Sequence, residues 1–247
     1  VKCKARRWMV PSNYDPIQRT YTGTWDGSMK SAWTNNPAWI TYGICTEDRF
    51  GLGKRIKPFM VDKWELYRIA QYCDQLVPNG LGGQEPRFLC DMNLQGKADA
   101  WSLLRDISAI YRGMTYWAQG QLVMQADMPR AQDFDYVFTR ANVIDGKFSY
   151  GSASAKTRYT RALVSYDNPA NNYDTDVIPF ADLDLQRRYG DRPTELSAIG
   201  CTRASEAQRR GKWAILSNNQ DRTVSFKTGM EGVIPLPGHI IPVADSL

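Results

Sequence analysis

Apolar residues recur at helical spacing between residues 100 and 111, and we take the resulting helix as the organising element of the chain. The members of this apolar stripe are Ala100, Trp101, Leu103, Leu104, Ile107, Ile110 and Tyr111. Asp99 is suited to cap the start of the helix through its side-chain oxygen, and Gly113 is suited to end it in a left-handed conformation. The pattern therefore predicts a capped helix.

A tight hairpin is predicted directly after this helix, because Gln119-Gly120 suits a two-residue turn between two strand-like runs. The pairs that this turn fixes are Ala118 with Gln121, Trp117 with Leu122 and Thr115 with Met124. Trp117 and Leu122 are then expected on the face that covers the apolar stripe, with Trp117 buried. Tyr116 is expected to face the other way, since neighbouring strand residues point to opposite faces.

Two further helices are predicted from their start signals. Asn36-Pro37 supplies a cap and a proline at the first helical position, and Asp62 stands in capping-box spacing with Glu65. A short strand is expected at residues 87–90. Together with the organising helix and hairpin, these elements predict an α+β domain over residues 36–130, in which two or three helices cover a small antiparallel sheet.

The two flanking regions have strand-like patterns. Residues 1–35 alternate polar and apolar positions from the first residue onward, which predicts a hairpin or a barrel edge in a piece of a longer polypeptide. Residues 131–247 predict a sandwich or barrel with a helical insertion at about 182–216, whose helices are expected at 182–189 and 202–216. The strands expected there are 136–139, 147–150, 160–166, 173–178, 194–199, 222–226 and 240–243.

Composition limits the classes of protein that fit. The 247 residues are 43% hydrophobic, which supports real cores, and 31 basic residues against 26 acidic ones are spread along the chain. We therefore expect a general solvated surface and no sequence-specific nucleic-acid binding. No apolar run is long enough to span a bilayer. Reduced, mostly buried thiols are expected, because no CxxC pair is present among Cys3, Cys45, Cys73, Cys90 and Cys201.

Nucleophilic catalysis requires a base, which is most often a histidine, and the chain contains one. His239 lies in a turn that enters a strand, where a half-packed imidazole is favoured over a catalytic base. Ser149 misses the GxSxG nucleophile motif by one residue and follows no strand-to-helix turn. Neither residue is therefore predicted to be catalytic.

Two loops resemble ligand-binding motifs but fail their requirements. In Gly51-Leu52-Gly53-Lys54, the first glycine of a phosphate loop would fall on Asp48 and its Ser/Thr on Arg55. A second loop is rich in oxygen ligands but lacks the glycine and terminal glutamate of a calcium loop, so a hairpin turn is favoured. Its polar residues are Asp167, Asn168, Asn171, Asn172, Asp174 and Asp176.

Carboxylate pairs and tryptophans are the residue types that a sugar-binding or sugar-cleaving site would use. Asp133/Asp135 and Asp182/Asp184 have the residue types of a glycosidase pair, but sequence spacing does not place either pair in a cleft. The tryptophans expected in cores rather than at a sugar site are Trp39, Trp64, Trp101, Trp117 and Trp213. The sequence therefore predicts no catalytic, cofactor-binding or metal-binding residue, and no enzyme.

Several longer runs carry a resemblance to a known family. They are NPAW at 36–39, DRFGLG at 48–53, AQYCD at 70–74, EPRF at 85–88, YRGM at 111–114, GCTR at 200–203 and GKW at 211–213. These runs closely resemble the host-specificity (tip attachment) protein J family of lambda-like tailed phages, and the resemblance covers nearly the whole chain.

The resemblance implies a multi-domain virion component made in the host cytoplasm. It implies the central hub of the tail tip, a homotrimer that joins the tail tube to the central fibre and serves host attachment and genome delivery. By the same resemblance, residues 1–35 end an incomplete first barrel domain, residues 36–130 are inserted, and residues 131–247 form a second barrel. Its partners would be other tail-tip and tail-tube proteins, and the host receptor would contact regions outside this chain.

One alternative belongs to another class of function. An envelope-processing or glycan-binding module would need two carboxylates in one cleft or exposed aromatic residues lining a groove.

Overall fold

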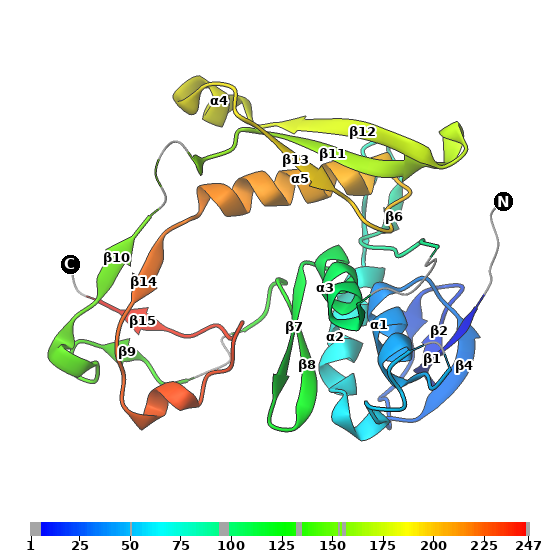
Figure 1. Cartoon of the computed structure of the whole chain (residues 1–247), viewed down its shortest axis with the longest axis horizontal. Coiled ribbons are helices and arrows are strands. Elements are labelled where there is room, and N and C mark those ends of the chain that lie inside the picture. The colour runs from blue at the N-terminus through cyan, green and yellow to red at the C-terminus, as the bar shows by residue number, and fades with distance from the viewer. Residues whose placement is uncertain are drawn as a thin grey trace. The chain divides into compact units, whose positions relative to one another are not determined.

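The computed structural model describes residues 6–49, 51–93, 99–131, 135–152, 154 and 157–245. The chain divides into two compact units, and Figure 1 labels their elements. Unit 1 consists of Val1–Asp127, Val164–Ile178 and Ser197–Arg209. Unit 2 consists of Met128–Leu163, Pro179–Leu196 and Arg210–Leu247.

Unit 1 contains the helices α1 (Pro37–Thr46), α2 (Lys63–Asp74) and α3 (Ala100–Ile110). The predicted start signals are confirmed. Asn36 accepts a hydrogen bond from the amide of Ala38, and Asp62 accepts from the amides at the start of α2. Asp99 likewise accepts from the amide of Ser102. These side chains satisfy amides that a helix leaves unpaired, which is why each helix begins where it does.

The hairpin after α3 has the predicted register. It is formed by β7 (Gly113–Ala118) and β8 (Gln121–Ala126), and Trp117 pairs with Leu122. The expected burial of Trp117 is wrong, because its side chain is 51% exposed whereas Leu122 is 1% exposed. In the middle of β7, Thr115 Oγ1 contacts Ser108 Oγ of α3 at 2.5 Å. Figure 1 shows the tip of the hairpin extending past α3. Leu122 is covered instead by the segment that leads into α2, because it pairs with Val61 and its carbonyl accepts from the amide of Asp62 at 3.2 Å.

The first strands of unit 1 form small antiparallel pairs. β1 (Arg7–Pro11) pairs with β4 (Met29–Trp33), and β2 (Tyr14–Asp15) pairs with β3 (Thr20–Tyr21). This agrees with the predicted hairpin, but a barrel edge is not confirmed.

The prediction of a strand at residues 87–90 is wrong. β5 (Leu76–Pro78) pairs instead with β6 (Gln84–Pro86), and the amides of Arg87 and Phe88 donate to carbonyls at the end of α2. The backbone of these two residues therefore completes a helix end rather than a sheet.

The predicted order of strands and helices in the second half agrees with the structure. The strands are β9 (Phe138–Thr139), β10 (Ser149–Gly151), β11 (Arg161–Asn168), β12 (Asp174–Ala181), β13 (Pro193–Ser197), β14 (Thr223–Ser225) and β15 (Val243–Ala244). The helices are α4 (Leu183–Tyr189) and α5 (Ala204–Asn219). The three-stranded sheet has the order β12-β11-β13, and the two-stranded sheets pair β10 with β14 and β15 with β9.

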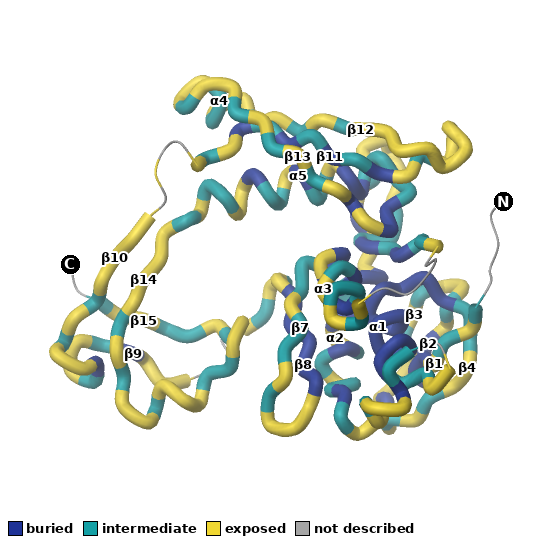
Figure 2. The backbone as a smooth tube through the Cα atoms, viewed as in Figure 1, coloured by how far each residue is buried: buried dark blue, intermediate teal, exposed yellow. Residues whose placement is uncertain are grey.

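Burial is concentrated in the helices of unit 1, as Figure 2 shows. Its largest fully buried side chains include Trp39, Tyr14, Tyr111, Phe88, Leu66 and Ile69. Trp39 therefore lies in a core as predicted. The core positions expected for Trp64 and Trp101 are wrong, since these side chains are 53% and 51% exposed.

The chain has a mixed helix and strand fold, which confirms the coarse fold class. The sheets that the described residues form have two or three strands, so the barrel and sandwich details are not confirmed. The three-part division at residues 36 and 131 stays a prediction. Among the described residues, no helix has the length and apolar character needed to cross a membrane.

Candidate functional site

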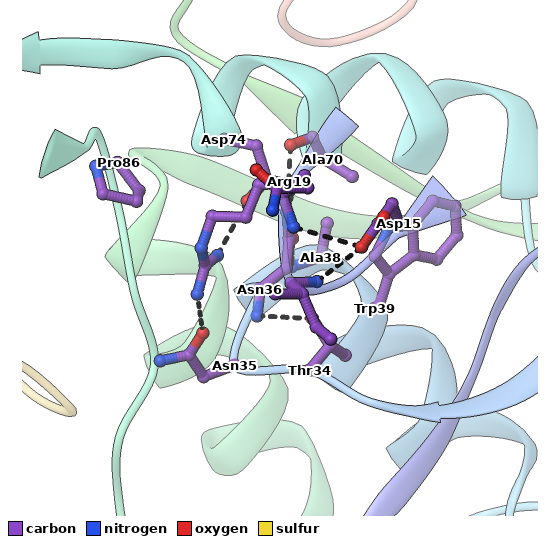
Figure 3. Close-up of polar contacts among 12 residues, drawn as sticks. Asp15, Arg19, Thr34, Asn35, Asn36, Ala38, Trp39, Ala70, Asp74 and Pro86 are labelled. Carbon is purple, nitrogen blue, oxygen red and sulfur yellow. Dashed lines mark hydrogen bonds and ion pairs between the residues drawn. The ribbon is translucent and has the colours of Figure 1, made fainter. Parts of the chain in front are cut away.

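Asp74, the last residue of α2, is the centre of a buried polar network in unit 1. Its Oδ1 accepts a hydrogen bond from Arg19 Nη1 at 2.8 Å. Its Oδ2 accepts from Tyr21 Oη at 3.0 Å and from Asn36 Nδ2 at 2.8 Å. Figure 3 shows Arg19 and Asn36 directed toward this carboxylate, with Asn35 at the other side of the Arg19 guanidinium. Both oxygens of Asp74 are thus engaged by side chains from other segments.

The local backbone conformation positions these side chains next to Asp74. Arg19 lies in the turn between β2 and β3 with a φ of 56°, a left-handed conformation that few non-glycine residues adopt. Asn36 caps α1 through its Oδ1, which leaves its Nδ2 to donate to Asp74 and to the carbonyl of Ala70. One residue therefore both starts α1 and joins it to α2.

Burial sets the electrostatics of this network. The side chains of Arg19 and Asp74 are 15% and 2% exposed, so the ion pair is shielded from solvent. Burial, and then the charge of Asp74, raise the pKa of Tyr21 far above its ordinary value. The Tyr21 phenol consequently stays protonated and acts as a donor to Asp74.

The network continues from Arg19 to segments that are distant in sequence. Arg19 Nη2 donates to Asn35 Oδ1, and Asn35 Nδ2 donates to Asp91 Oδ1 at 2.9 Å. Thr202 Oγ1 donates to the other carboxylate oxygen of Asp91 at 3.2 Å, and the amide of Asp91 donates to the carbonyl of Gly200 at 2.9 Å. The network therefore joins the first strands to the segment before α5.

A second charged cluster lies around Glu85 of β6, also in unit 1. Glu85 Oε1 accepts from Arg209 Nη1 at 2.5 Å and from Ser205 Oγ at 2.7 Å, and Arg203 Nη1 lies 3.3 Å from Oε2. Arg203 also pairs with the fully buried Glu206. These contacts hold the first turns of α5 against β6 from several directions.

The runs that carry the family resemblance converge in these networks. Asn36 (36–39) donates to Asp74 (70–74), and Glu85 (85–88) pairs with Arg203 (200–203). A fifth run, at 111–114, contributes a cation–π contact, because Arg112 lies 5.2 Å from the ring centroid of Phe88. Segments separated by more than a hundred residues thus meet in one polar framework.

This framework is suited to cross-linking segments rather than to chemistry. The oxygens of Asp74 and Glu85 accept from arginine, tyrosine, asparagine and serine donors, so neither carboxylate is placed as a general base. A buried ion pair that loses one partner leaves an uncompensated charge. The networks therefore penalise any packing in which these segments separate.

A groove of about 360 Å³ opens beside the 3-10 helix η1 (Pro58–Met60) in unit 1. Its lining residues are Tyr42, Pro58, Phe59, Val61, Asp62, Lys63, Trp64 and Gln121. Phe59 is 74% exposed and Trp64 is 53% exposed, so two aromatic faces border the opening. The nearby polar groups bind the main chain, since Lys63 Nζ donates to the carbonyl of Gly27 and Gln121 Nε2 to that of Phe59.

The two residues considered for catalysis, His239 and Ser149, both belong to unit 2. His239 is half-buried, and its Nδ1 accepts from the amide of Leu236 at 3.2 Å, which closes the turn predicted there. Ser149 is exposed at the start of β10, where it pairs with Ser225 of β14. Each residue therefore has a local structural role.

The two loops weighed as ligand sites are turns. Gly53 is buried, and a Cβ at that position would lie 2.3 Å from the carbonyl oxygen of Thr46, so close packing requires the glycine. In the acidic loop, Asn168 caps the 3-10 helix η4 (Pro169–Asn171), and its Nδ2 donates to Asp176. The predicted hairpin turn is confirmed, and no metal-binding cluster of three or more His, Cys, Asp or Glu residues is found among the described residues.

The remaining candidates are also dispersed. Asp182 caps α4, and Asp184 pairs with Arg187 one turn later. Asp135 is exposed, and Asp133 lies outside the described residues, as do Cys3 and part of the 48–53 run. Trp213 is intermediate in burial. The described thiols are buried and are not in disulfides, as expected: Cys45, Cys73, Cys90 and Cys201.

Sequence reasoning missed the residues that form the networks. Arg19 and Asp74 are 55 positions apart, and Glu85 and Arg209 are 124 positions apart, so no local spacing connects them. The only signal was indirect, because the runs quoted for the family resemblance contain Asn36, Asp74, Glu85 and Arg203.

Comparison with known proteins gives a consistent result. Residues 99–246 match the family described as "Putative phage tail protein". Two curated relatives carry the name "Tip attachment protein J". That of Escherichia phage SECphi4 is 50% identical over 246 residues, which is 100% of this chain and 22% of the relative. That of Escherichia phage SECphi27 is 48% identical over 246 residues, which is 100% of this chain and 20% of the relative. The chain thus spans about a fifth of their length.

Solved structures give weaker similarities. A tail protein from Neisseria meningitidis MC58 aligns with a TM-score of 0.42 at 13% identity, over 66% of this chain and 48% of that protein. The 43 kDa tail protein of prophage MuSo2 from Shewanella oneidensis aligns with a TM-score of 0.38 at 16% identity, over 62% of this chain and 45% of that protein. These scores are too low to assign a shared fold.

Proposed function

We propose that this chain, which belongs to the phage tail protein family and has a structural role in the tail, forms part of the central hub of the tail tip. The observation that carries this proposal is the identity of about half of all residues with two tip attachment proteins along the entire chain. Within the full-length protein, the hub joins the tail tube to the central fibre and takes part in host attachment and genome delivery.

The hub is a homotrimer in this proposal, and its other partners are tail-tip and tail-tube proteins. It is made in the host cytoplasm and resides in the virion tail tip. Residues 1–35 belong to a first barrel domain, residues 36–130 form an inserted α+β domain, and residues 131–247 form a second barrel domain with a helical insertion at about 182–216. Receptor contact belongs to regions of the full-length protein beyond this chain.

The polar networks support a structural role. A hub must keep its shape while neighbouring proteins pull on it during attachment, and buried ion pairs resist separation of the segments they join. The Asp74 and Glu85 networks join segments from the beginning and the end of unit 1. A part with this function needs no assembled acid–base pair, so we propose that the chain is not an enzyme.

An inserted epitope tag tests the location in the virion. Leu81 is 92% exposed, and side chains added at Gly80 or Gly82 would meet nothing within 4 Å, so the loop between β5 and β6 can carry a tag. Gold-labelled antibody should bind at the tail tip of intact virions. The same tag beside Gly190, which is equally open, should label the same end. Label along the tube or on the capsid would contradict the proposal.

One observation favours a second candidate function, a glycan-binding module. Phe59 and Trp64 are exposed aromatic residues that line a groove, which is the feature such a module requires. Its polar side chains are held by the main chain, which leaves fewer donors for sugar hydroxyls. Incubation with peptidoglycan and with ester and glycoside substrates should show neither retention nor turnover. Retention lost in Trp64→Ala, or activity lost in one carboxylate variant, would support the alternative.

A further inference from the structure

Exposed cations lie next to the groove beside η1. Lys54, Arg55 and Lys57 are all exposed and directly precede η1 in the chain. Together with Phe59 and Trp64 they form what we call the basic aromatic groove. Surfaces of this kind combine apolar anchors with charges that select the partner, and the cations favour an acidic partner.

A surface with the opposite charge occurs elsewhere in unit 1, at the tip of the β11–β12 hairpin. Asp167, Asp174 and Asp176 are exposed there. Tyr173 is 39% exposed and Val177 is 52% exposed, so the acidic residues surround two apolar side chains. We call these five residues the acidic hairpin tip.

The backbone of the acidic hairpin tip holds Tyr173 in an unusual conformation. Its φ is 64°, and that of Asn172 is 53°, so two successive residues are left-handed. Asparagine tolerates this region, but a tyrosine there is strained. Such strain is often found where a side chain is presented for binding. Here the effect is to place an aromatic ring at the end of an acidic hairpin.

We propose that the acidic hairpin tip of one copy docks into the basic aromatic groove of a second copy of this chain. Tyr173 would enter between Phe59 and Trp64, while the aspartates face Lys54, Arg55 and Lys57. This inference rests on the self-association in the proposed function and specifies its contact. The contact pairs two different surfaces, which is the kind that closes into a ring.

A second copy is the occupant that charge and position favour. Asp62 and Lys63 balance each other in the groove lining, and the segment that enters η1 adds three exposed cations. The hairpin has three exposed aspartates, so the two surfaces are complementary. In the chain, η1 shortly precedes α2, and Figure 1 shows α2 and the β11–β12 hairpin on opposite sides of unit 1. The acidic hairpin tip of one copy can therefore dock only into the basic aromatic groove of another copy.

Zero-length cross-linking tests this pairing directly. A carbodiimide joins a lysine amine to a carboxylate with loss of water, and mixing ¹⁴N- and ¹⁵N-labelled chains distinguishes links between copies from links within one. We expect mixed-isotope peptides that join Lys54 or Lys57 to Asp174 or Asp176. Lys57 Nζ lies 4.0 Å from Asp48 Oδ1 in the same chain, so that same-isotope link serves as the internal control.

Substitutions test whether these residues form the contact between copies rather than stabilise the fold. Tyr173→Asn should keep the left-handed backbone and raise the dissociation constant of self-association by about tenfold or more, because it removes an interface anchor. Reversing Lys54, Arg55 and Lys57 to glutamate should do the same, and mixing this variant with one that reverses the three aspartates to lysine should restore association. The matched control reverses Lys147, Lys212 and Lys227, which are exposed elsewhere.

The outcomes distinguish a failure of the proposed contact from a failure of the trimeric hub. Links between copies at other residues, or unchanged association in the charge-reversed variant, would overturn the proposed contact while leaving the hub in place. If the wild-type chain and a version extended at both ends show no association at any concentration, the trimeric hub fails as well.

Discussion

Arg19 and Asp74 form a buried ion pair across 55 positions of sequence, with Arg19 Nη1 2.8 Å from Asp74 Oδ1. The pair joins the β2–β3 turn to the last residue of α2, and Asn36 binds the same carboxylate from the start of α1. Three elements of unit 1 are therefore fixed by one charged group. The stability of unit 1 should depend strongly on this group.

Arg19→Met should destabilise the protein by about 3–5 kcal/mol, because it leaves Asp74 buried without its counter-charge. Arg68→Met, on the helix that carries Asp74, is the control. The Arg68 side chain is 51% exposed and pairs with Glu65, so its loss should cost less than about 1 kcal/mol. Chemical denaturation of both variants measures the difference. Equal midpoints would show that Asp74 does not depend on Arg19.

Local signals were sufficient to predict the helix starts and the hairpin register. Asn36, Asp62 and Asp99 cap their helices because the required side-chain oxygen lies within three residues of the amide that it accepts from. Gln119-Gly120 fixed the pairing of β7 and β8 because both residues adopt positive φ, 52° and 76°. These features depend on neighbours in sequence and need no tertiary contact.

Burial along the hairpin could not be predicted in the same way. The alternation of side chains indicates the two faces, but Trp117 and Leu122 lie side by side on one face and differ in burial. Leu122 is covered because it pairs with Val61 in the segment that leads into α2, a contact that sequence spacing does not reveal. Leu122→Ala should therefore cost about 2–5 kcal/mol, since Leu122 is 1% exposed. Trp117→Ala, at the paired position, should cost less than about 1 kcal/mol. Urea titration of the two variants checks this order, and a larger loss for Trp117 would contradict the observed burial.

The candidate site was beyond sequence reasoning for a related reason. Ion pairs such as Glu85 with Arg209 form only after β6 and α5 have come together, so neither residue stands out in its own segment. The residues that did stand out, such as His239 and Asp182, have local roles that close a turn or cap a helix. Spacing along the sequence identifies local structure, whereas the polar framework depends on contacts between segments that are distant in sequence.

Stability should fall at alkaline pH because of buried thiols and phenols. Burial raises the pKa of Cys45 from 9.0 to about 12. Between these values the unfolded chain releases a proton that the folded chain retains. The free energy of unfolding should therefore decrease as pH rises from about 9 to about 12, by up to about 1.4 kcal/mol per pH unit for this group.

Cys45→Ala tests this assignment by denaturation at several pH values. The variant should show a shallower alkaline decrease, while the buried phenols of Tyr21 and Tyr111 maintain part of it, because their pKa values are also raised by burial. At pH 8 the native protein should react slowly with thiol reagents, and all five cysteines should react after denaturation without reductant. An unchanged slope in the variant would contradict the role of Cys45.

The central claim is that this chain is part of a trimeric hub at the tail tip, and a reconstruction of the tail tip from intact virions tests it most directly. Electron cryo-microscopy without imposed symmetry should locate the arrangement of α1, α2, α3 and the β7–β8 hairpin three times around the tail axis, at the end of the tube. A single copy on the axis, or the same arrangement repeated along the tube, would contradict the account.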